Sequence, residues 1–510
     1  MKNSRRWLSL FCMTLLMFVL VSSAQINDEA FRPQFHFTPA TGWMNDPNGL
    51  VYDNGEYHLF YQHNPKETKW GPMHWGHAVS PDLIHWQHLP IALEPDKIGM
   101  IFSGSAVIDS SNTAGFGAGA LVAIFTHDDT ATETQSLAYS TDQGRAWTKY
   151  ANNPVLKAPG NIRNFRDPKV FWYTSSRDAG HWVMSLAVGN AILFYASSDL
   201  KNWTPTGGFG FGYGATCGVW ETPDLFELPV VGATGKRWVL TVGTSDCAPA
   251  GGTGIQYFVG QFDGKTFKSN NPKNTVLWAD YGADFYAAQS WNNTPDGRRI
   301  WASWMNNWRY ADKIPTTAWR GALSFPRELG LKRTPLGGRL TQKPISELEQ
   351  LRGTPVLFEN LNVTGNLTLE NVNGEKLEIR LAFKPDSSNM PDRFGIRVRV
   401  SQNEQTTIGF ATRESKLFVD RSRSGQTNFS PSFPSAHVAP LELLNGELRL
   451  HLLIDRASLE VFTEDGLVSM TESIFPENSS TGIQLFADNG KMTVSHLEIA
   501  QLTSVLSTSK

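Results

Sequence analysis

Ser80-Pro81-Asp82-Leu83-Ile84-His85-Trp86 recurs later in the chain as Ser197-Ser198-Asp199-Leu200-Lys201-Asn202-Trp203. A looser copy, Ser140-Thr141-Asp142-Gln143-Gly144-Arg145-Ala146-Trp147, lies between them, and Phe262-Asp263-Gly264-Lys265-Thr266-Phe267 is a distant fourth. Each copy is typical of a strand, an Asp or Gly turn and an aromatic returning strand. A spacing of roughly 60 residues leaves room for four short strands per repeat. About 310 residues at that period predict a five-bladed β-propeller, with an irregular all-β sandwich as the alternative.

The sequence pattern changes after residue 342. Ile345, Leu348 and Leu351 follow Pro344 at helical spacing, which predicts a short linker helix. Residues 377–383, 394–400 and 448–454 then alternate between apolar and polar side chains, as antiparallel strands of a two-sheet sandwich do. We therefore expect an all-β chain with a propeller over residues 32–342, a linker helix over 343–354 and a β-sandwich over 355–505.

The N-terminus has the features of a secretory signal peptide over residues 1–24. A basic start precedes a largely apolar run, and Ser22-Ser23-Ala24 offers small residues for cleavage. The apolar run is short for a membrane anchor, which is the alternative. We therefore expect a secreted protein with no membrane partner. Six Asn-x-Ser/Thr sequons would be glycosylated only in a eukaryotic secretory pathway; they begin at Asn202, Asn292, Asn362, Asn366, Asn428 and Asn478.

Removal of the signal peptide removes Cys12 and leaves Cys217 and Cys247. In an oxidising compartment this pair predicts either one disulfide or two free buried thiols.

Charge and composition bound the kind of ligand. The 510 residues include 45 basic and 48 acidic side chains, a formal net charge of −3, which becomes about −6 without the basic residues of the signal peptide. This balance argues against nucleic acid and anionic membranes and favours a neutral substrate. Of the 17 Trp and 30 Phe, we expect most in the core and a few lining a pocket, because sugars stack on exposed aromatic faces.

Three acidic residues share one sequence context. Each has a proline one or two residues later and an aromatic residue one to three residues earlier; they are Asp46 in Trp43-Met44-Asn45-Asp46-Pro47-Asn48-Gly49, Asp167 in Phe165-Arg166-Asp167-Pro168, and Glu221 in Trp220-Glu221-Thr222-Pro223. Because proline ends ladder pairing, each acid is predicted to be the last residue of a strand at one rim of the fold. Glycoside hydrolysis needs two carboxyl groups beside the scissile bond, so these acids predict chemistry on a sugar, with ordinary strand-end turns as the alternative.

These motifs, in this order, resemble glycoside hydrolase family 32, the invertase, inulinase and levanase group. Similar patches run along nearly the whole mature chain: Phe102-Ser103-Gly104-Ser105, Trp304-Met305-Asn306-Asn307-Trp308, Phe325-Pro326-Arg327-Glu328-Leu329, and the segment from Ile454 to Phe462. The resemblance implies a catalytic five-bladed propeller and a C-terminal β-sandwich. Within the last patch, we interpret Asp455-Arg456-Ala457-Ser458-Leu459-Glu460 as a turn and strand that hold the sandwich.

The resemblance also implies roles for individual residues. Asp46 is expected to be the nucleophile, Glu221 the acid/base and Asp167 the stabiliser of the transition state, with Arg166 keeping Asp167 ionised. The side chains expected around a terminal fructose are Trp43, Asn45, Gln62, Trp70, Phe102, Ser103 and Arg166, with Trp304, or alternatively Trp308, as a stacking wall. Carboxylates suffice for this chemistry, so neither a metal nor a cofactor is required.

One position departs from the family pattern. The family usually has Cys after the third acid, whereas this chain has Thr222. We expect the Thr222 hydroxyl to hydrogen-bond the Glu221 carboxylate and so tune the acid.

The expected function is that of a retaining, exo-acting β-fructosidase on fructans such as inulin or levan. The Trp304–Trp308 segment, with Ile314-Pro315-Thr316 soon after, looks more like exo-inulinases and levanases than plant or yeast invertases. Invertase action on sucrose and fructosyl transfer are the alternatives that use the same acids. A non-catalytic sugar-binding propeller is a further alternative, but the three intact acids argue against it. The motif around Asp46 does not fit an inverting arabinanase.

Overall fold

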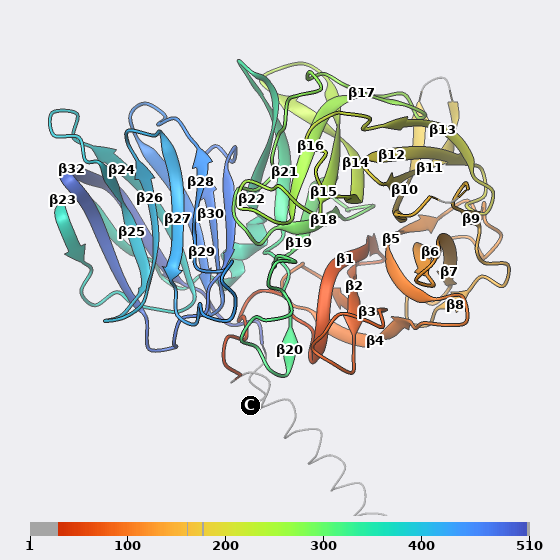
Figure 1. The fold of residues 1–510 in the computed structure, drawn as a ribbon, viewed down its shortest axis with the longest axis horizontal. Coiled ribbons are helices and arrows are strands. Elements are labelled where there is room, and N and C mark those ends of the chain that lie inside the picture. The colour runs from red at the N-terminus through yellow and green to blue at the C-terminus, as the bar shows by residue number, and fades with distance from the viewer. Residues whose placement is uncertain (1–28, 161, 176–177, 507–510) are drawn as a thin grey trace, which may run out of the picture.

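The structure is a computed structural model that describes residues 29–160, 162–175 and 178–506. The described chain consists of β-strands and one 3-10 helix, which agrees with the predicted all-β class. Two bodies lie side by side: an N-terminal β-propeller and a C-terminal β-sandwich (Figure 1). The predicted signal peptide lies outside the described residues. None of the helices in the described part of the chain is long and apolar enough to cross a membrane.

The first three sheets of the propeller follow one another along the chain. Apart from the late strand β20 (Trp319–Arg320) in the first sheet, their strands pair antiparallel with their neighbours, because short connections join consecutive strands. The first comprises β1 (Gly42–Asp53), β2 (Glu56–Asn64), β3 (His74–Ser80), β4 (Gln87–Leu93) and the late strand β20 (Trp319–Arg320). The second comprises β5 (Met100–Asp109), β6 (Ala120–Asp128), β7 (Glu133–Ser140), β8 (Thr148–Lys149) and β9 (Leu156–Lys157). The third comprises β10 (Phe165–Ser175), β11 (Asp178–Val188), β12 (Ala191–Ser197) and β13 (Thr204–Phe209).

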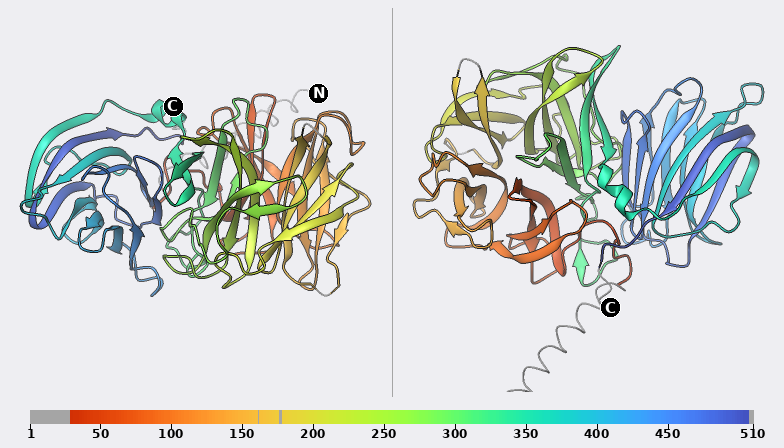
Figure 2. Two further views of the ribbon diagram at one scale, coloured as in Figure 1. Left: turned by 90° about the horizontal axis from the view of Figure 1, so that it is seen from above. Right: turned by 180° about the vertical axis from the view of Figure 1, so that it is seen from behind.

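The remaining propeller strands form one continuous hydrogen-bonded sheet, because the end of β14 pairs in parallel with β21. One part contains β14 (Trp220–Val231), β15 (Lys236–Thr244), β16 (Gly254–Phe262) and β17 (Phe267–Ser269). The other contains β18 (Tyr286–Ser290), β19 (Arg299–Trp304), β21 (Arg327–Thr334) and β22 (Gly337–Pro344). The inner strands β1, β5, β10, β14 and β18 contact one another in a closed ring (Figure 2). The late strand β20 pairs in parallel with β1.

The sequence repeat corresponds to one recurring turn. Its copies connect β3 to β4, β7 to β8, β12 to β13 and β16 to β17, the outer corners of successive sheets. In the first copy Asp82 Oδ1 accepts hydrogen bonds from the backbone N–H groups of Ile84 and His85, at 3.0 and 2.9 Å. The indole of Trp86 donates to the carbonyl of Leu83, and Trp203 repeats this contact in the third copy. The predicted strand, turn and returning strand are therefore present, but the tryptophan anchors the turn just before the returning strand begins.

The sandwich is built around one long strand. The first half of β32 (Gly482–Gln501) pairs with β25, and the second half pairs with β24, so this strand passes from one layer to the other. Apolar side chains of both layers form a single core. The strands are β23 (Val356–Thr368), β24 (Leu377–Pro385), β25 (Arg393–Val400), β26 (Gln405–Ala411), β27 (Lys416–Arg423), β28 (Ala436–Pro440), β29 (Leu448–Asp455), β30 (Ser458–Thr463), β31 (Ser469–Ser473) and β32.

A short helix joins the two bodies. The segment predicted to be a linker helix forms a 3-10 helix, η1 (Ser346–Leu351). Leu348 and Leu351 are buried in an apolar cluster that contains side chains of both bodies, among them Phe325 and Phe462. The linker therefore contributes to the interface that it spans.

Buried charges also hold the propeller to the sandwich. Asp455 accepts hydrogen bonds from the backbone N–H of Phe35 at 3.0 Å and from His36 Nδ1 at 2.9 Å. Glu460 accepts from Nε2 of the same imidazole at 2.9 Å and from Arg327 Nε at 3.1 Å. Because both ring nitrogens face carboxylates, His36 is an imidazolium ion with two donors. The Asp455–Glu460 motif thus holds the propeller as well as the sandwich, which the sequence interpretation had not included.

This interface predicts a pH-dependent stability. Burial by itself lowers the pKa of His36, but hydrogen bonds and charges from Asp455 and Glu460 outweigh it and raise the pKa to about 9. Because His36 holds its proton more tightly in the folded than in the unfolded protein, the protonated imidazole stabilises the fold. This stabilisation is complete below pH 6.5 and is lost as the pH rises through 9. We expect the free energy of unfolding to fall by about 3 kcal/mol over that interval, measured by denaturant unfolding across a pH series. His36→Gln should be less stable at pH 6.5 and lose this dependence.

The matched control is His85→Gln, which alters an exposed histidine paired with Asp82 on the surface. It should retain the pH dependence of the unmodified protein. An unchanged pH dependence in His36→Gln would contradict the role given to the buried imidazolium.

Candidate active site

The three predicted acids converge on one cavity of about 510 Å³ at one mouth of the propeller. Asp46 is in β1, Asp167 in β10 and Glu221 in β14, all of them inner strands. The other residues that line the cavity are Asn45, Gln62, Trp70, Met100, Phe102, Ser103, Asp128, Thr130, Glu133, Arg166, Tyr286 and Trp308. The structure thus brings together the three acids and six of the eight side chains predicted around them.

A β-bulge lies beside each acid. The regular antiparallel register breaks between Met44 and Pro47, between Arg166 and Lys169, and between Glu221 and Asp224. Proline is tolerated inside a strand at such a bulge, because the extra residue has no ladder hydrogen bond to donate. The prediction that each acid ends a strand is therefore wrong. The acids lie near the beginning of inner strands that continue through the proline, although they do face one rim.

Two residues of these bulges adopt left-handed backbone conformations. The φ angle is 63° at Asp167 and 47° at Thr222. Such angles are uncommon for non-glycine residues and strained for a β-branched one. The backbone N–H of Thr222 donates to Asp167 Oδ2 at 2.8 Å, so the two bulges support each other across neighbouring inner strands.

Asp46 is held by neutral donors. Asn45 Nδ2 donates to Oδ1 at 2.9 Å, and Ser103 Oγ donates to Oδ2 at 2.6 Å. Trp43 acts behind this pair, because its indole donates to Asn45 Oδ1 at 2.7 Å. Burial raises the pKa of Asp46 to about 6, against the effect of both donors and with a contribution from the Glu221 charge. Asp46 is therefore mainly a carboxylate above pH 6.

Asp167 is buried beside the other two acids. Burial raises its pKa well above the usual value; the Arg166 charge opposes that shift, while Asp46 and Glu221 add to it. Arg166 thus acts in the expected direction, but burial outweighs it.

Glu221 has polar partners that orient it. Arg166 Nη2 donates to Oε1 at 2.8 Å, and the Tyr286 hydroxyl donates to Oε2. Arg166 Nη1 also donates to Glu133 at 2.6 Å, so the guanidinium bridges two acids. Tyr286 and Glu133 escaped the sequence analysis. Tyr286 is the first residue of β18, the fifth inner strand. Its place at the start of an inner strand, where three other inner strands carry an acid, is the one signal that could have identified it as a site residue.

The aromatic wall differs from the prediction. Trp304 and Trp43 are fully buried, so neither ring reaches the cavity, and the predicted stacking wall at Trp304 is incorrect. Trp308 lines the cavity instead and is 38% exposed. Its ring stacks on Trp43, with centroids 5.8 Å apart and an interplanar angle of 22°. Trp70 and Phe102 form another part of the wall, with an edge-to-face contact at 5.8 Å.

Gln62 is tied to the same network through Asn48. With the Asn48 amide oriented to satisfy both neighbours, its oxygen accepts from Gln62 Nε2 at 3.1 Å and its nitrogen donates to Ser103 Oγ at 3.2 Å. Asn48 is fully buried and was missed as a supporting residue, although it belongs to the motif around Asp46.

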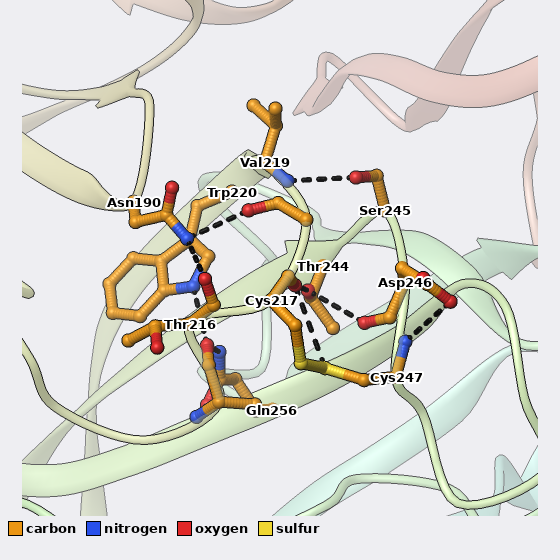
Figure 3. The surroundings of a disulfide bond; sticks show 12 residues. Asn190, Thr216, Cys217, Val219, Trp220, Thr244, Ser245, Asp246, Cys247 and Gln256 are labelled. Atoms are coloured by element: carbon orange, nitrogen blue, oxygen red, sulfur yellow. Dashed lines mark hydrogen bonds between the residues drawn. A yellow bond between two sulfur atoms is a disulfide. The ribbon is translucent and has the colours of Figure 1, made fainter.

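A disulfide fixes the segment before Glu221. Cys217 and Cys247 are bonded, with Cα atoms 6.2 Å apart, which decides between the two alternatives left by the sequence. The bond joins the loop that leads into β14 to the loop that follows β15 (Figure 3). Thr244 Oγ1 reinforces it by donating to the carbonyl of Cys217 at 2.8 Å (Figure 3).

Comparison with known proteins places the chain. It matches the model of the glycosyl hydrolases family 32 N-terminal domain over residues 36–344 and that of the family 32 C-terminal domain over residues 347–501. The chain belongs to glycoside hydrolase family 32. The resemblance carried by the sequence motifs is therefore confirmed.

Similar proteins include a levanase and an exo-inulinase. A levanase of Bacillus subtilis (strain 168) is 51% identical over 94% of this chain and 72% of its own length. An extracellular exo-inulinase of Aspergillus ficuum is 39% identical over 94% of this chain and 95% of its own. Among solved structures, exo-inulinase from Aspergillus awamori has a TM-score of 0.88 at 36% identity, covering 94% of this chain and 99% of that one.

Thr222, where the family usually has Cys, does not contact Glu221 as expected. Its hydroxyl is buried and has no hydrogen-bond partner among the described residues. A buried hydroxyl without a partner costs about 1–3 kcal/mol. The role proposed for this hydroxyl in tuning Glu221 is thus incorrect, and Thr222 acts through its backbone N–H.

We expect Thr222→Cys to raise the free energy of unfolding by about 1 kcal/mol, because it removes an unsatisfied hydroxyl and a β-branched side chain at positive φ. The pH profile of activity should not move. Thr222→Val removes only the hydroxyl and Thr222→Ser removes only the branching, so denaturant unfolding of the pair separates the two causes. A shifted pH profile for Thr222→Val would restore the tuning role.

Proposed function

We propose that this family 32 protein is a retaining exo-β-fructosidase that releases terminal β-D-fructofuranosyl residues from fructans and from sucrose. The observation that carries the proposal is the placement of Asp46 and Glu221 on different inner strands beside one cavity, each with its own set of partners. Retaining hydrolysis needs a carboxylate nucleophile and a second carboxyl that donates and later accepts a proton.

Asp46 serves as the nucleophile in this mechanism. Its carboxylate attacks the anomeric C2 of fructose while the C2–O bond to the leaving group breaks. Asn45 and Ser103 hold its two oxygens, which limits the rotation of the carboxylate before attack. Near neutral pH the group is mainly ionised, as a nucleophile must be.

Glu221 serves as the acid and then the base. It gives a proton to the leaving oxygen, and in the second half it takes a proton from the water that hydrolyses the fructosyl–enzyme ester. Arg166 and Tyr286 fix the orientation of its carboxyl group. Asp167 faces the same cavity and binds sugar hydroxyls, stabilising the charge that develops on the ring.

The shape of the cavity supports exo action. Trp308, Trp70 and Phe102 line a pocket of about 510 Å³, a volume suited to a small ligand. Gln62 and Ser103 supply polar contacts, whereas Trp43 supports Asn45 from behind. Trp70 is 44% exposed at the rim, where the leaving part of the substrate would extend toward solvent.

The relatives support the same activity. A levanase and an extracellular exo-inulinase align with 94% of the chain, and a β-fructofuranosidase of Schwanniomyces occidentalis in complex with fructosyl-erythritol has a TM-score of 0.85 at 31% identity. We further propose that the protein is secreted, with residues 1–24 as its signal peptide. The substrate is a neutral carbohydrate, with neither nucleic acid nor membrane as a partner.

The architecture proposed for this activity has five blades over residues 32–342, a linker over 343–354 and a sandwich over 355–505. The closed ring of inner strands β1, β5, β10, β14 and β18 supports the blade number. Each of these strands begins at the mouth that holds the cavity and contributes at least one of its lining residues.

The products of early hydrolysis test the proposal. A pocket that admits one terminal ring should release free fructose from inulin and levan, with chain length falling slowly, as measured by chromatography over the first few per cent of conversion. A dominant inulotriose or inulotetraose peak would exclude exo action.

Asp46→Ala and Glu221→Ala should lose several orders of magnitude in kcat, and an activated leaving group should restore the fructosylation step for Glu221→Ala alone.

Trp308 and Trp304 provide a matched pair of variants. Trp308→Ala should raise KM for sucrose several-fold with little change in the unfolding midpoint, because its ring faces the cavity. Trp304→Ala should lower the free energy of unfolding by about 3–5 kcal/mol, the usual cost of removing a buried tryptophan side chain. Steady-state kinetics and denaturant unfolding distinguish the two roles, and the reverse pattern would return the stacking wall to Trp304.

A further inference from the structure

A second cavity, of about 600 Å³, opens at the mouth of the propeller opposite the three acids. The inner strands locate it: Asp167 lies near the start of β10, whereas Phe171 and Trp172 line the second cavity further along the same strand. At about 3.3 Å per residue, this separation is roughly 15 Å. The second cavity is therefore distinct from the candidate active site.

Buried polar side chains separate the two cavities inside the ring. Lys169 Nζ lies 3.2 Å from Asp224 Oδ2 and donates to the carbonyl of Ser290 at 2.7 Å, which links β10, β14 and β18. The backbone N–H of Ser290 donates to Asp224 at 2.7 Å. These contacts cross the channel between the two mouths. A ligand in the second cavity would therefore not reach the acids by passing through the ring.

The second cavity presents exposed aromatic surface. Trp172 is 41% exposed, and its ring stands edge-to-face on Trp182, with centroids 5.0 Å apart. Trp182 is in turn fixed by a hydrogen bond from its indole to Thr113 Oγ1 at 2.9 Å. A supported, half-exposed tryptophan offers a flat apolar face that needs little ordering when a ligand stacks on it.

The charges around this cavity balance. Two acids and two bases line it: Asp109, Glu227, Lys236 and Arg299. Glu227 and Lys236 pair with each other at 3.2 Å, and Asp109 accepts hydrogen bonds from Thr113 and Ala114. The charge of Arg299 is opposed by nearby Asp224. The cavity therefore selects for neither an anion nor a cation.

Polar groups without charge complete the lining. The exposed Ser110 and Ser111 lie at its edge, together with the amide of Asn293. A neutral ligand with an apolar face and several hydroxyls matches a tryptophan platform bordered by hydroxyl and amide groups. A furanose or pyranose ring has both properties, because its C–H groups form a face while its hydroxyls project from the edge.

We propose that the second cavity is a non-catalytic binding site for a carbohydrate chain, with Trp172 as its stacking platform. The identification of the bound carbohydrate as a fructan rests on the proposed function. Binding of one stretch of a polymer here would raise the local concentration of its chain ends near the acids at the opposite mouth. Small substrates such as sucrose, which engage only one site at a time, gain nothing from it.

The test is native electrophoresis in gels that contain levan, with dextran gels as the polymer control. Every protein carries Glu221→Ala, so that the levan is not digested during the run. We expect levan to retard the otherwise unmodified protein and Trp172→Ala to weaken the apparent association constant at least threefold. Ser111→Leu, a change at an exposed position that narrows the cavity, should weaken it as well and decides the outcome if Trp172→Ala does not fold.

Phe211→Ala is the matched control, because Phe211 is an aromatic residue that is 65% exposed outside both cavities. Retardation unchanged by Trp172→Ala and Ser111→Leu, or weakened equally by Phe211→Ala, would overturn the proposal. In the catalytically intact background, the ratio of KM for levan to KM for sucrose should rise at least threefold with Trp172→Ala. If the unmodified enzyme does not hydrolyse fructans, the proposed function is wrong. Retardation by levan that depends on Trp172 would still support the second site in that case.

Discussion

A β-bulge near the start of each of the five inner strands is the constraint on which the candidate active site depends, and three of these bulges carry an acid. In a regular strand, every second side chain points to the same face. Without a bulge, each inner strand would therefore direct alternate side chains toward the centre of the ring. The extra residue beside Pro47, Pro168 and Pro223 instead turns one carboxyl from each strand toward the mouth of the ring. The strained backbone at Asp167 and Thr222 is the energetic cost of this arrangement, and the hydrogen bond between them offsets part of it.

The bulges also explain the electrostatics. Carboxyls brought to one level of a narrow ring are removed from water and repel one another, so the pKa values of Asp46 and Asp167 both rise. Arg166 supplies the nearby positive charge, but its hydrogen bonds go to Glu221 and Glu133. The guanidinium thus orients one acid while its field acts on another. Supporting residues in this site are shared between strands, and the geometry depends on the ring remaining closed.

Much of this architecture was predictable because it repeats or alternates. The Asp-turn copies located the outer corners of four sheets, and period-two patterns located β24, β25 and β29. Proline was misread as the end of a strand because local sequence does not distinguish termination from a bulge; the partner strand decides. The choice of Trp304 over Trp308 as the stacking wall failed for a related reason. Trp304 ends β19 and Trp308 lies in the turn that follows, and both rings contact Trp43. Only the tertiary packing shows that Trp304 is buried and Trp308 exposed. Tyr286 and Glu133 reach the site from other blades and carry no local motif.

The pairing of His36 and Arg327 with Asp455 and Glu460 has a consequence for recombination between relatives. Two of these residues belong to the propeller and two to the sandwich, and all four side chains are fully buried. A chimera that joins the propeller of one protein to the sandwich of another inherits half of each ion pair from each parent. If the other parent lacks the matching half, a charge is left in the interior without its counterion, at a cost of several kcal/mol. Exchange of either domain should therefore preserve stability only when both parents carry matching residues at these four positions.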